Sequence, residues 1–443
     1  MKRFWFVWLS LGLITVFSAS AFAVDVKSSG EYYVAGMYLN KTKVDDADTN
    51  PSTAFFYQRL RVRTDFIVSP GLKLVTRFDT LERIWGGARS TPGTTLASDS
   101  AGTRAENENI ALDWAYVDYV SPIGTITAGY MQTSDTGTDF GNNVAPNGRL
   151  KYTTPAMGPF VIDAKITKKT DSNWSYNNNP VGWTDGDSTV YEVQGKYKWT
   201  DGVAGLQIGY SDNNTKRPPS SGNYSQKYLV FTPYVIAKIG PVALQAEFNY
   251  ATGDYKKYDQ PDSHTDVKLE NISGWVDATA TFAPVYVGAT VAYVSGDKPD
   301  TSDKKEGGAL NGGRDWNPCL IMFNYYDVAY WAGDVQGHNG SKLTGPMENA
   351  WFFQGRVGVK PKPEIDAMLS VSHAVADVKP QGYPNSTYGT EVDLTGTYKI
   401  TNNLSYTLGV GYLFTGDYFK GEDAPGTKVN DDYIVMNKLT LTF

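Results

Sequence analysis

The feature that most constrains this 443-residue chain is an alternation of polar and apolar side chains that recurs in many segments. In residues 391–400, for example, Glu391 and Asp393 fall on one face, whereas Val392 and Leu394 fall on the other. Successive side chains of a β-strand point to opposite faces, so this pattern predicts strands with one wet face and one apolar face. The chain is therefore expected to have an all-β fold.

We count 18 expected strands, an even number that returns both chain ends to the same side of a membrane. The segment 149–156 has the weakest pattern, so 16 strands is the alternative. The phase of 109–121 is open, because either face of its central residues, Trp114 to Asp118, could point inward. The expected strands are residues 29–40, 55–68, 72–85, 109–121, 124–132, 149–156, 159–168, 188–200, 204–212, 226–238, 241–252, 268–283, 285–296, 349–360, 364–376, 387–400, 403–415 and 431–443.

The connections between these segments are alternately short and long. Tight turns such as Ser69-Pro70-Gly71 separate pairs of strands whose other ends carry long polar loops. In a soluble β-sandwich the apolar faces would form a core, but sandwiches do not alternate their loop lengths in this way. Short periplasmic turns, long extracellular loops and many aromatic residues at strand ends are typical of outer-membrane barrels. The expected fold is a transmembrane antiparallel up-and-down β-barrel. Its long loops are expected near residues 41–53, 86–108, 132–148, 169–187, 212–225, 252–268, 296–348, 377–386 and 416–430.

Residues 1–23 have the pattern of a secretory signal peptide. Lys2 and Arg3 precede an apolar run that is too short to span a bilayer comfortably, and the segment ends in small residues at Ala21 and Ala23. The barrel domain is therefore expected at residues 24–443, exported through the periplasm. Without the two basic residues the net charge changes from −7 to −9, which does not suggest nucleic acid as a partner.

The last expected strand ends in an aromatic residue, with apolar residues at alternate positions before it. Asn437 interrupts this face and leaves the pattern readable. The pattern resembles the terminal-strand signature that the bacterial barrel-assembly machinery reads, and the resemblance implies insertion into outer-membrane lipid with that machinery as a partner. The residues of this assembly signal are Tyr433, Val435, Leu439, Leu441 and Phe443.

Charged residues on the second expected strand indicate a wet interior. Arg59, Arg61 and Arg63 share one face of this strand, opposite Leu60 and Val62. An arginine that faces lipid near the midplane costs about 2–4 kcal/mol, so three of them on one face must line a water-filled lumen.

Two segments resemble the general trimeric porins of Gram-negative proteobacteria. Residues 147–160 contain an Arg, a Tyr, a Pro and a Gly-aromatic pair in the order of the porin segment that follows the constriction loop, and residues 119–130 supply the turn and strand before it. The resemblance implies an outer-membrane homotrimer whose third long loop, here residues 132–148, folds into the lumen. The acidic-aromatic-Gly-Gly run of the best-known members is absent, and the Phe140-Gly141 pair stands in its place.

In such porins, carboxylates of the third loop face basic residues of the wall. The alternative is that these are ordinary solvated charges. The expected pore-lining and constriction residues are Arg59, Arg61, Arg63, Arg77, Asp135, Asp139, Arg149, Lys151 and Lys165.

The resulting functional hypothesis is a passive, water-filled channel for ions and small hydrophilic solutes. The alternatives are a solute-specific channel, and a structural barrel or sheath that supports an electron-transfer or adhesion partner. With three histidines, two of them in long loops, and a single cysteine, no enzymatic activity is expected, and neither is a cofactor or a metal. The longest loop, 296–348, contains an apolar run from Cys319 to Phe323, which is expected to pack on the barrel mouth or on a neighbouring subunit.

Overall fold

The computed structural model describes residues 24–46, 51–86, 110–133, 136–143, 145–171, 186–217, 222–259, 264–308, 313–343, 345–422 and 426–443. The signal peptide expected at residues 1–23 lies outside the described residues. Among the described residues, no helix is long and apolar enough to cross a membrane.

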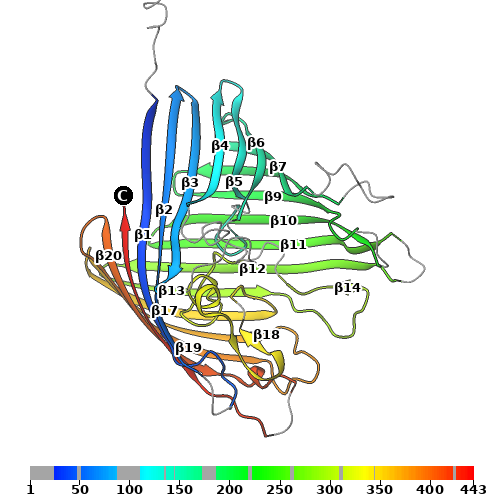
Figure 1. Cartoon of the computed structure of the whole chain (residues 1–443), viewed down its shortest axis with the longest axis vertical. Coiled ribbons are helices and arrows are strands. Elements are labelled where there is room, and N and C mark those ends of the chain that lie inside the picture. Colours follow the sequence, from blue (N-terminus) through cyan, green and yellow to red (C-terminus); the bar gives the residue numbers. More distant parts are fainter. Residues whose placement is uncertain are drawn as a thin grey trace, which may run out of the picture.

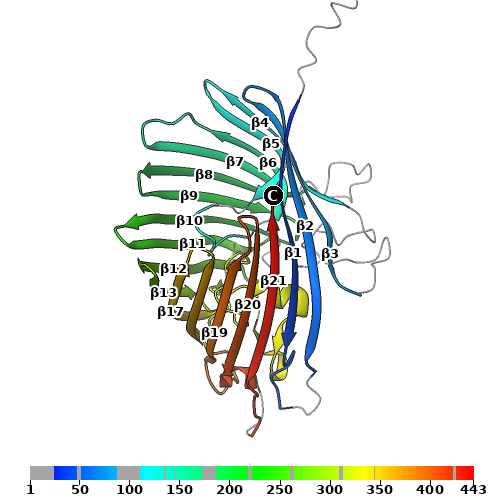
Figure 2. The ribbon, with the colours of Figure 1, turned by 90° about the vertical axis from the view of Figure 1, so that its left-hand side faces the viewer.

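One antiparallel sheet of described strands closes on itself (Figure 1). The short β14 (Lys304–Lys305) joins it by parallel pairing with Lys268 and Leu269, and β15 (Val335–Gln336) and β16 (Lys342–Leu343) form a separate two-stranded sheet. Eighteen strands pair in chain order, and the last pairs with the first, from Glu31 opposite Thr442 to Leu39 opposite Ile434. Figure 2 shows these two strands side by side. The strands are β1 (Asp25–Leu39), β2 (Thr53–Ser69), β3 (Leu72–Ile84), β4 (Ala111–Ser121), β5 (Gly124–Thr133), β6 (Ala145–Thr153), β7 (Phe160–Thr170), β8 (Ser188–Trp199), β9 (Gly202–Asn213), β10 (Tyr224–Ile239), β11 (Val242–Tyr258), β12 (Val267–Phe282), β13 (Val285–Val294), β17 (Ala350–Lys362), β18 (Ile365–Ala376), β19 (Thr387–Lys399), β20 (Leu404–Thr415) and β21 (Asp432–Thr442).

The 18-strand prediction is confirmed, and the 16-strand alternative is wrong. β6 occupies the segment with the weakest pattern and pairs with both of its neighbours. The short connections lie at one end of the barrel and the long loops at the other, because each strand antiparallel to the last returns the chain to the opposite end. The C-terminal residue is held against β1 by two hydrogen bonds. Gly30 N–H donates to the Phe443 carbonyl at 2.8 Å, and Phe443 N–H donates to the Gly30 carbonyl at 3.1 Å.

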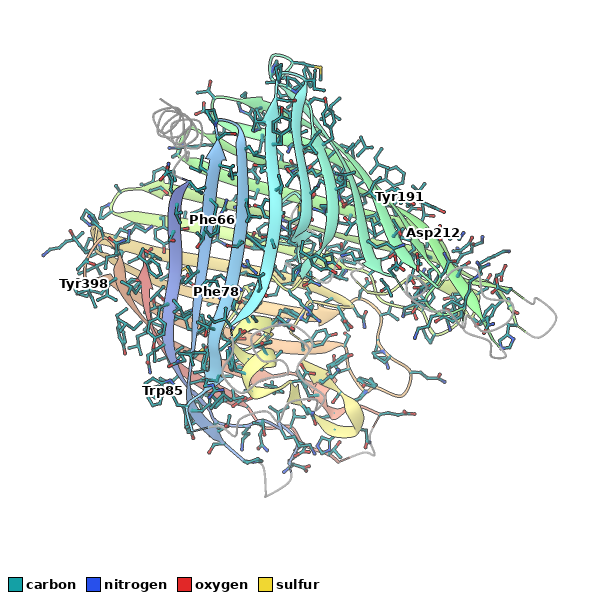
Figure 3. The ribbon with its side chains drawn as sticks, turned by 45° about the horizontal axis from the view of Figure 1, so that its top comes forward. Phe66, Phe78, Trp85, Tyr191, Asp212 and Tyr398 are labelled. Carbon is teal, nitrogen blue, oxygen red and sulfur yellow. The ribbon has the colours of Figure 1, made fainter. Side chains whose placement is uncertain are left out.

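The two faces of each strand differ as the alternation predicts. On β8 the side chains of Tyr191 and Val193 are 47% and 55% exposed on the outside, whereas Glu192 and Gln194 are buried on the inside. Tyr191 and, near the other end of the barrel, Tyr398 lie on the outer surface in Figure 3. A closed sheet that is apolar outside and polar inside is suited to lipid around it and water within it.

β4 explains why the phase of residues 109–121 could not be assigned. Arg77 of β3 pairs with Trp114, but the next residue, Phe78, pairs with Leu112, so Asp113 is the extra residue of a β-bulge. The Arg77 guanidinium donates to Asp113 at 2.9 Å and lies 3.8 Å from the ring centroid of Trp114. Two consecutive side chains therefore contact the same lumenal group, and neither simple alternation fits the whole strand.

Candidate functional site: the eyelet of the channel

The loop between β5 and β6, called L3 here (residues 134–144, described over 136–143), folds into the lumen. Thr138 donates its N–H and its hydroxyl to the Glu247 carboxylate of β11, at 2.6 and 2.8 Å. The Thr136 hydroxyl donates to Gln207 of β9 at 2.5 Å. Glu247 and Gln207 are buried on the inner face of the wall. The prediction that the third loop enters the barrel is confirmed.

Two glycines let the backbone of L3 wrap around the Glu247 carboxylate. A Cβ atom at Gly137 or at Gly141 would overlap the carboxylate oxygens of Glu247. Gly137 also has a φ of +83°, in the left-handed region that side chains with a Cβ rarely adopt. The Gly of the Phe140-Gly141 pair is thus required by the close approach of L3 to the wall.

The longest loop, called L7 here (residues 295–349, between β13 and β17), also enters the lumen. Ile321 and Met322 donate their N–H groups to the two carboxylate oxygens of Glu391 on β19, at 2.6 and 2.7 Å. Gln354 of β17 donates to the Pro318 carbonyl at 2.8 Å. The run from Cys319 to Phe323 was expected on the barrel mouth or on a neighbouring subunit, but it packs inside the barrel against the inner wall.

L7 continues into two short helical turns, η2 (Tyr325–Ala329) and α2 (Tyr330–Ala332), drawn in yellow among the strands in Figure 1. Asn324 caps the first turn, because its side chain accepts from Asp327 N–H at 3.0 Å and donates to the Cys319 and Leu320 carbonyls. Asp327 in turn accepts from the Tyr57 hydroxyl of β2 at 2.7 Å. L7 therefore bridges the lumen from β19 to β2.

Between L3, L7 and the wall lies a cavity of about 540 Å³, which we call the eyelet. Both loops border it, and its lining is polar, charged and aromatic. The wall contributes Tyr33, Arg59, Arg61, Arg77, Asp79, Glu82, Asp113, Gln132, Pro146 and Lys438, L3 contributes Asp139, Asn142 and Asn143, and L7 contributes Arg314, Asp315, Asn317, Tyr325, Tyr326, Asp327, Tyr330 and Trp331.

Some basic residues of the eyelet wall are held tightly by wall carboxylates. Arg61 makes a bidentate pair with Asp79, with N···O distances of 2.7 and 2.6 Å. Arg77 is paired with Asp113, as described above. Such charge-assisted pairs fix the direction of each guanidinium and offset most of its charge.

Arg59 and Lys438 are bound more loosely. The guanidinium of Arg59 lies 3.7 Å from each of Glu31 and Glu82, and its Nε has no hydrogen-bond partner. The Nζ of Lys438 lies 4.3 Å from the ring centroid of Tyr33, and none of the ion pairs between described residues includes Lys438. Arg59 lies over the same ring at 5.1 Å. These two cations keep more capacity for a solute than Arg61 or Arg77.

The structure brings four of the nine predicted pore residues into the eyelet: Arg59, Arg61, Arg77 and Asp139. Asp135 lies outside the described residues. The other four predicted residues are not among the eyelet lining. Arg63 pairs with Asp65 at 2.8 Å, Arg149 pairs with Glu192 at 2.9 Å, and Lys165 donates to Gln207 at 3.1 Å. Lys151 lies on β6, directly opposite Lys165 of β7.

The sequence analysis missed Lys438 and all the L7 residues of the eyelet. Lys438 could have been found, because it stands on the inward phase of β21, between Asn437 and Leu439 of the outward phase. Tyr433, Leu439, Leu441 and Phe443 are exposed on the outer face of this strand. That the barrel-assembly machinery recognises these residues stays a prediction.

One group of possible metal ligands occurs among the described residues, at Cys319, Glu391 and Asp393. Both carboxylate oxygens of Glu391 already accept N–H groups of L7, and Asp393 accepts from Leu320 N–H at 3.4 Å. The arrangement holds the loop on the wall.

Comparison with known proteins identifies the family. A family model described as Gram-negative porin matches residues 10–309, more than half of the chain. The chain belongs to the Gram-negative porin family. It is accordingly a porin of the outer membrane, a channel and not an enzyme. No curated protein matches the sequence.

Solved structures of Pseudomonas aeruginosa channels share the fold. OpdK with vanillate is 13% identical, with a TM-score of 0.51 over 94% of this chain and 99% of that one. OccK8 (OprE) is 13% identical, with a TM-score of 0.50 over 94% and 98%. OccK2 (OpdF) in complex with glucuronate is 11% identical, with a TM-score of 0.50 over 95% and 97%. At these identities the likeness concerns the fold alone.

Proposed function

We propose that this porin is a general diffusion channel for ions and small hydrophilic solutes, with its size limit set at the eyelet. The observation that carries the proposal is the entry of both L3 and L7 into the lumen, which leaves a charged cavity of about 540 Å³ between them. Cavities of this size hold one small molecule, so larger solutes are excluded.

The mechanism follows from how charge is arranged around the eyelet. The wall lining carries four basic groups against three carboxylates, whereas the loop lining carries Asp139, Asp315 and Asp327 against Arg314 alone, so the wall side is net positive and the loop side net negative. Fixed charges of opposite sign on different sides orient the water between them, and a solute passes when its own polar groups replace that water. An apolar solute offers no such replacement and is rejected.

Two of the three loop carboxylates, Asp315 and Asp327, are held in place by tyrosine hydroxyls. Tyr326 donates to Asp315 at 2.6 Å, and Tyr57 donates to Asp327 as described above. Burial and the hydrogen bond to Asp315 raise the pKa of Tyr326, so its hydroxyl stays protonated and remains a donor. At neutral pH the Tyr326 hydroxyl therefore continues to hold the Asp315 carboxylate in its place in the eyelet.

Reconstitution in planar bilayers tests the proposal. Steady conductance that rises in proportion to bulk salt, and swelling of liposomes by small but not large sugars, are the expected results. Silence in the bilayer would contradict it and would favour a structural barrel or sheath.

A second candidate, a channel selective for small anionic solutes, is favoured by Arg59 and Lys438. Their charges are only loosely compensated, and both cations lie over the ring of Tyr33 in the eyelet lining. Two of the structural relatives are described with small carboxylates, vanillate and glucuronate. Conductance that saturates with one carboxylate would support this candidate.

Reversal potentials in a salt gradient separate the two candidates. The double variant Arg59→Gln with Lys438→Gln should shift the reversal potential toward cation preference. Arg63→Gln is the matched control, because Arg63 is paired with Asp65 and does not line the eyelet. Equal shifts in both variants would remove the assignment to Arg59 and Lys438.

A homotrimer in outer-membrane lipid is the assembly we propose, and polar groups on the outer face of β1 to β3 support it. Gln58 accepts from Trp85 Nε1 at 2.7 Å, and the Ser28 and Thr64 hydroxyls lie 3.5 Å apart. Polar side chains fit a protein contact better than lipid. Chemical crosslinking in native membranes should give a ladder that ends at three subunits. Export by the signal peptide at residues 1–23 completes this proposal.

A further inference from the structure

The inner wall behind L7 is apolar, unlike the wall around the eyelet. Leu39 of β1, Phe352 of β17, Leu413 of β20 and Ile434 of β21 face inward and are fully buried beneath L7. They form one core cluster with the run from Cys319 to Phe323. Removing L7 would expose apolar surface of this cluster to water, so the loop is part of the barrel core.

L3 lacks such an apolar base of its own. Its one large buried apolar side chain among the described residues is Phe140, which stacks on Trp275 of β12 with ring centroids 5.9 Å apart. The other contacts of L3 with the wall are polar. They go to Glu247, to Gln207, to Lys165 of β7 and to the indole N–H of Trp275. Each hydrogen bond of this kind contributes only about 0.5–1.5 kcal/mol net, less than the burial of a large apolar side chain.

The second ring against Phe140 belongs to L7. Trp316 meets Phe140 edge to face, with centroids 5.2 Å apart, and also meets Phe352 of the wall at 5.3 Å. Beside this contact, Asp315 N–H donates to the Asn142 carbonyl at 3.3 Å. A continuous aromatic path thus runs from the dry core under L7 to the tip of L3.

We propose that Trp316 is a positioning residue for the eyelet, by which the fixed loop L7 sets the place of L3. Trp316 does not line the eyelet, and it acts through Phe140 on the neighbouring residues Asp139 and Asn142, which do. The inference rests on the proposed diffusion channel, because it explains what fixes the width of that channel.

Single-channel recording of Trp316→Ala tests the inference. Without the Trp316 ring, L3 should move more freely and the eyelet should widen. Conductance should then rise by up to about twofold, because current follows the open cross-section, and open-channel noise should increase. Trp316→Phe keeps an edge-to-face ring and should resemble the wild type. Trp351→Ala is the matched control, because Trp351 lies on the outer face, against Tyr293.

A chemical measurement accompanies the recordings. In a Cys319→Ser background, Asp139→Cys places a thiol on L3, and a water-soluble maleimide should react with it about tenfold faster when Trp316→Ala is added, because reaction follows exposure. Heat-modifiable mobility in gels verifies that each variant is folded.

The outcomes separate the two proposals. A silent wild type overturns the diffusion channel itself. A conducting wild type with unchanged conductance, noise and thiol reactivity in Trp316→Ala overturns only the role of Trp316. The same changes in Trp351→Ala would also overturn it.

Discussion

L3 and L7 both enter the barrel, and each is held by a wall glutamate that accepts hydrogen bonds from the loop. Glu247 binds Thr138 of L3, and Glu391 binds Ile321 and Met322 of L7. The surfaces behind the two glutamates differ. L7 lies on an apolar wall and is part of the core, whereas L3 lies on a polar wall with Phe140 as its main apolar contact.

This difference divides two tasks between the loops. Buried apolar area supplies large, non-directional stabilisation, and L7 uses it to fill one side of the lumen. Hydrogen bonds supply direction with little net free energy, and L3 uses them to aim Asp139 at the eyelet. We therefore expect changes under L7 to affect the free energy of unfolding, and changes under L3 to affect conduction.

A pair of Phe→Ala substitutions gives the largest expected effect. Phe352→Ala should lower the free energy of unfolding by about 3–5 kcal/mol, because it leaves a cavity in a closed core. Phe140→Ala should lower it by less, because a loop can relax into the space, but it should raise conductance. Denaturant unfolding in detergent, followed by tryptophan fluorescence, measures the first effect, and bilayer recording the second. Equal losses of unfolding free energy in the two variants would contradict the assignment of stability to L7 and of conduction to L3.

A pair of Glu→Gln substitutions sharpens the comparison at a smaller magnitude. Both carboxylate oxygens of Glu391 and of Glu247 accept hydrogen bonds, so an amide of the same size must leave one donor unsatisfied. An unsatisfied buried donor costs about 1–3 kcal/mol. Glu391→Gln should show this cost in the unfolding of the whole barrel, whereas Glu247→Gln should release L3 and raise open-channel noise.

One outcome of the Glu391→Gln and Glu247→Gln comparison would contradict the different roles assigned to the two loops. If Glu391→Gln adds as much noise as Glu247→Gln and leaves the unfolding midpoint unchanged, L7 is as mobile as L3. The core role assigned to L7 would then fail.

The strands and their phases could be predicted from the sequence because a strand's faces are a local property. The alternation around Glu192 is visible in nine residues, and all 18 strands follow from such windows. Even the weak segment at β6 obeys it. The exception, β4, fails for a local reason as well, since one extra residue at Asp113 shifts the phase.

On the strands, most of the basic residues of the site could be predicted from the charge pattern, whereas on the loops only Asp139 was found, through the resemblance to the porin constriction loop. Arg59, Arg61 and Arg77 were found because charge on an alternating face must point to water. The L7 residues were missed because their position depends on Glu391, about 70 positions later in the chain. An apolar run in a loop has no periodicity from which its packing partner could be predicted. The residues around Cys319 showed that the segment avoids water, but not which wall it covers.

The smallest expected effect concerns Cys319, at the centre of the L7 contact. Burial raises the pKa of the Cys319 thiol, and the nearby carboxylates of Glu391 and Asp393 raise it further. The thiol should therefore resist maleimide at pH 8 in the folded porin and react with one equivalent after unfolding. Cys319→Ala should cost only about 1 kcal/mol, since little apolar area is lost. Trp316→Ala should leave the thiol protected, because L7 stays docked when L3 is freed. Rapid labelling of the folded wild type would show that the wall under L7 opens to water, and the distinction between a fixed loop and an adjustable one would then be lost.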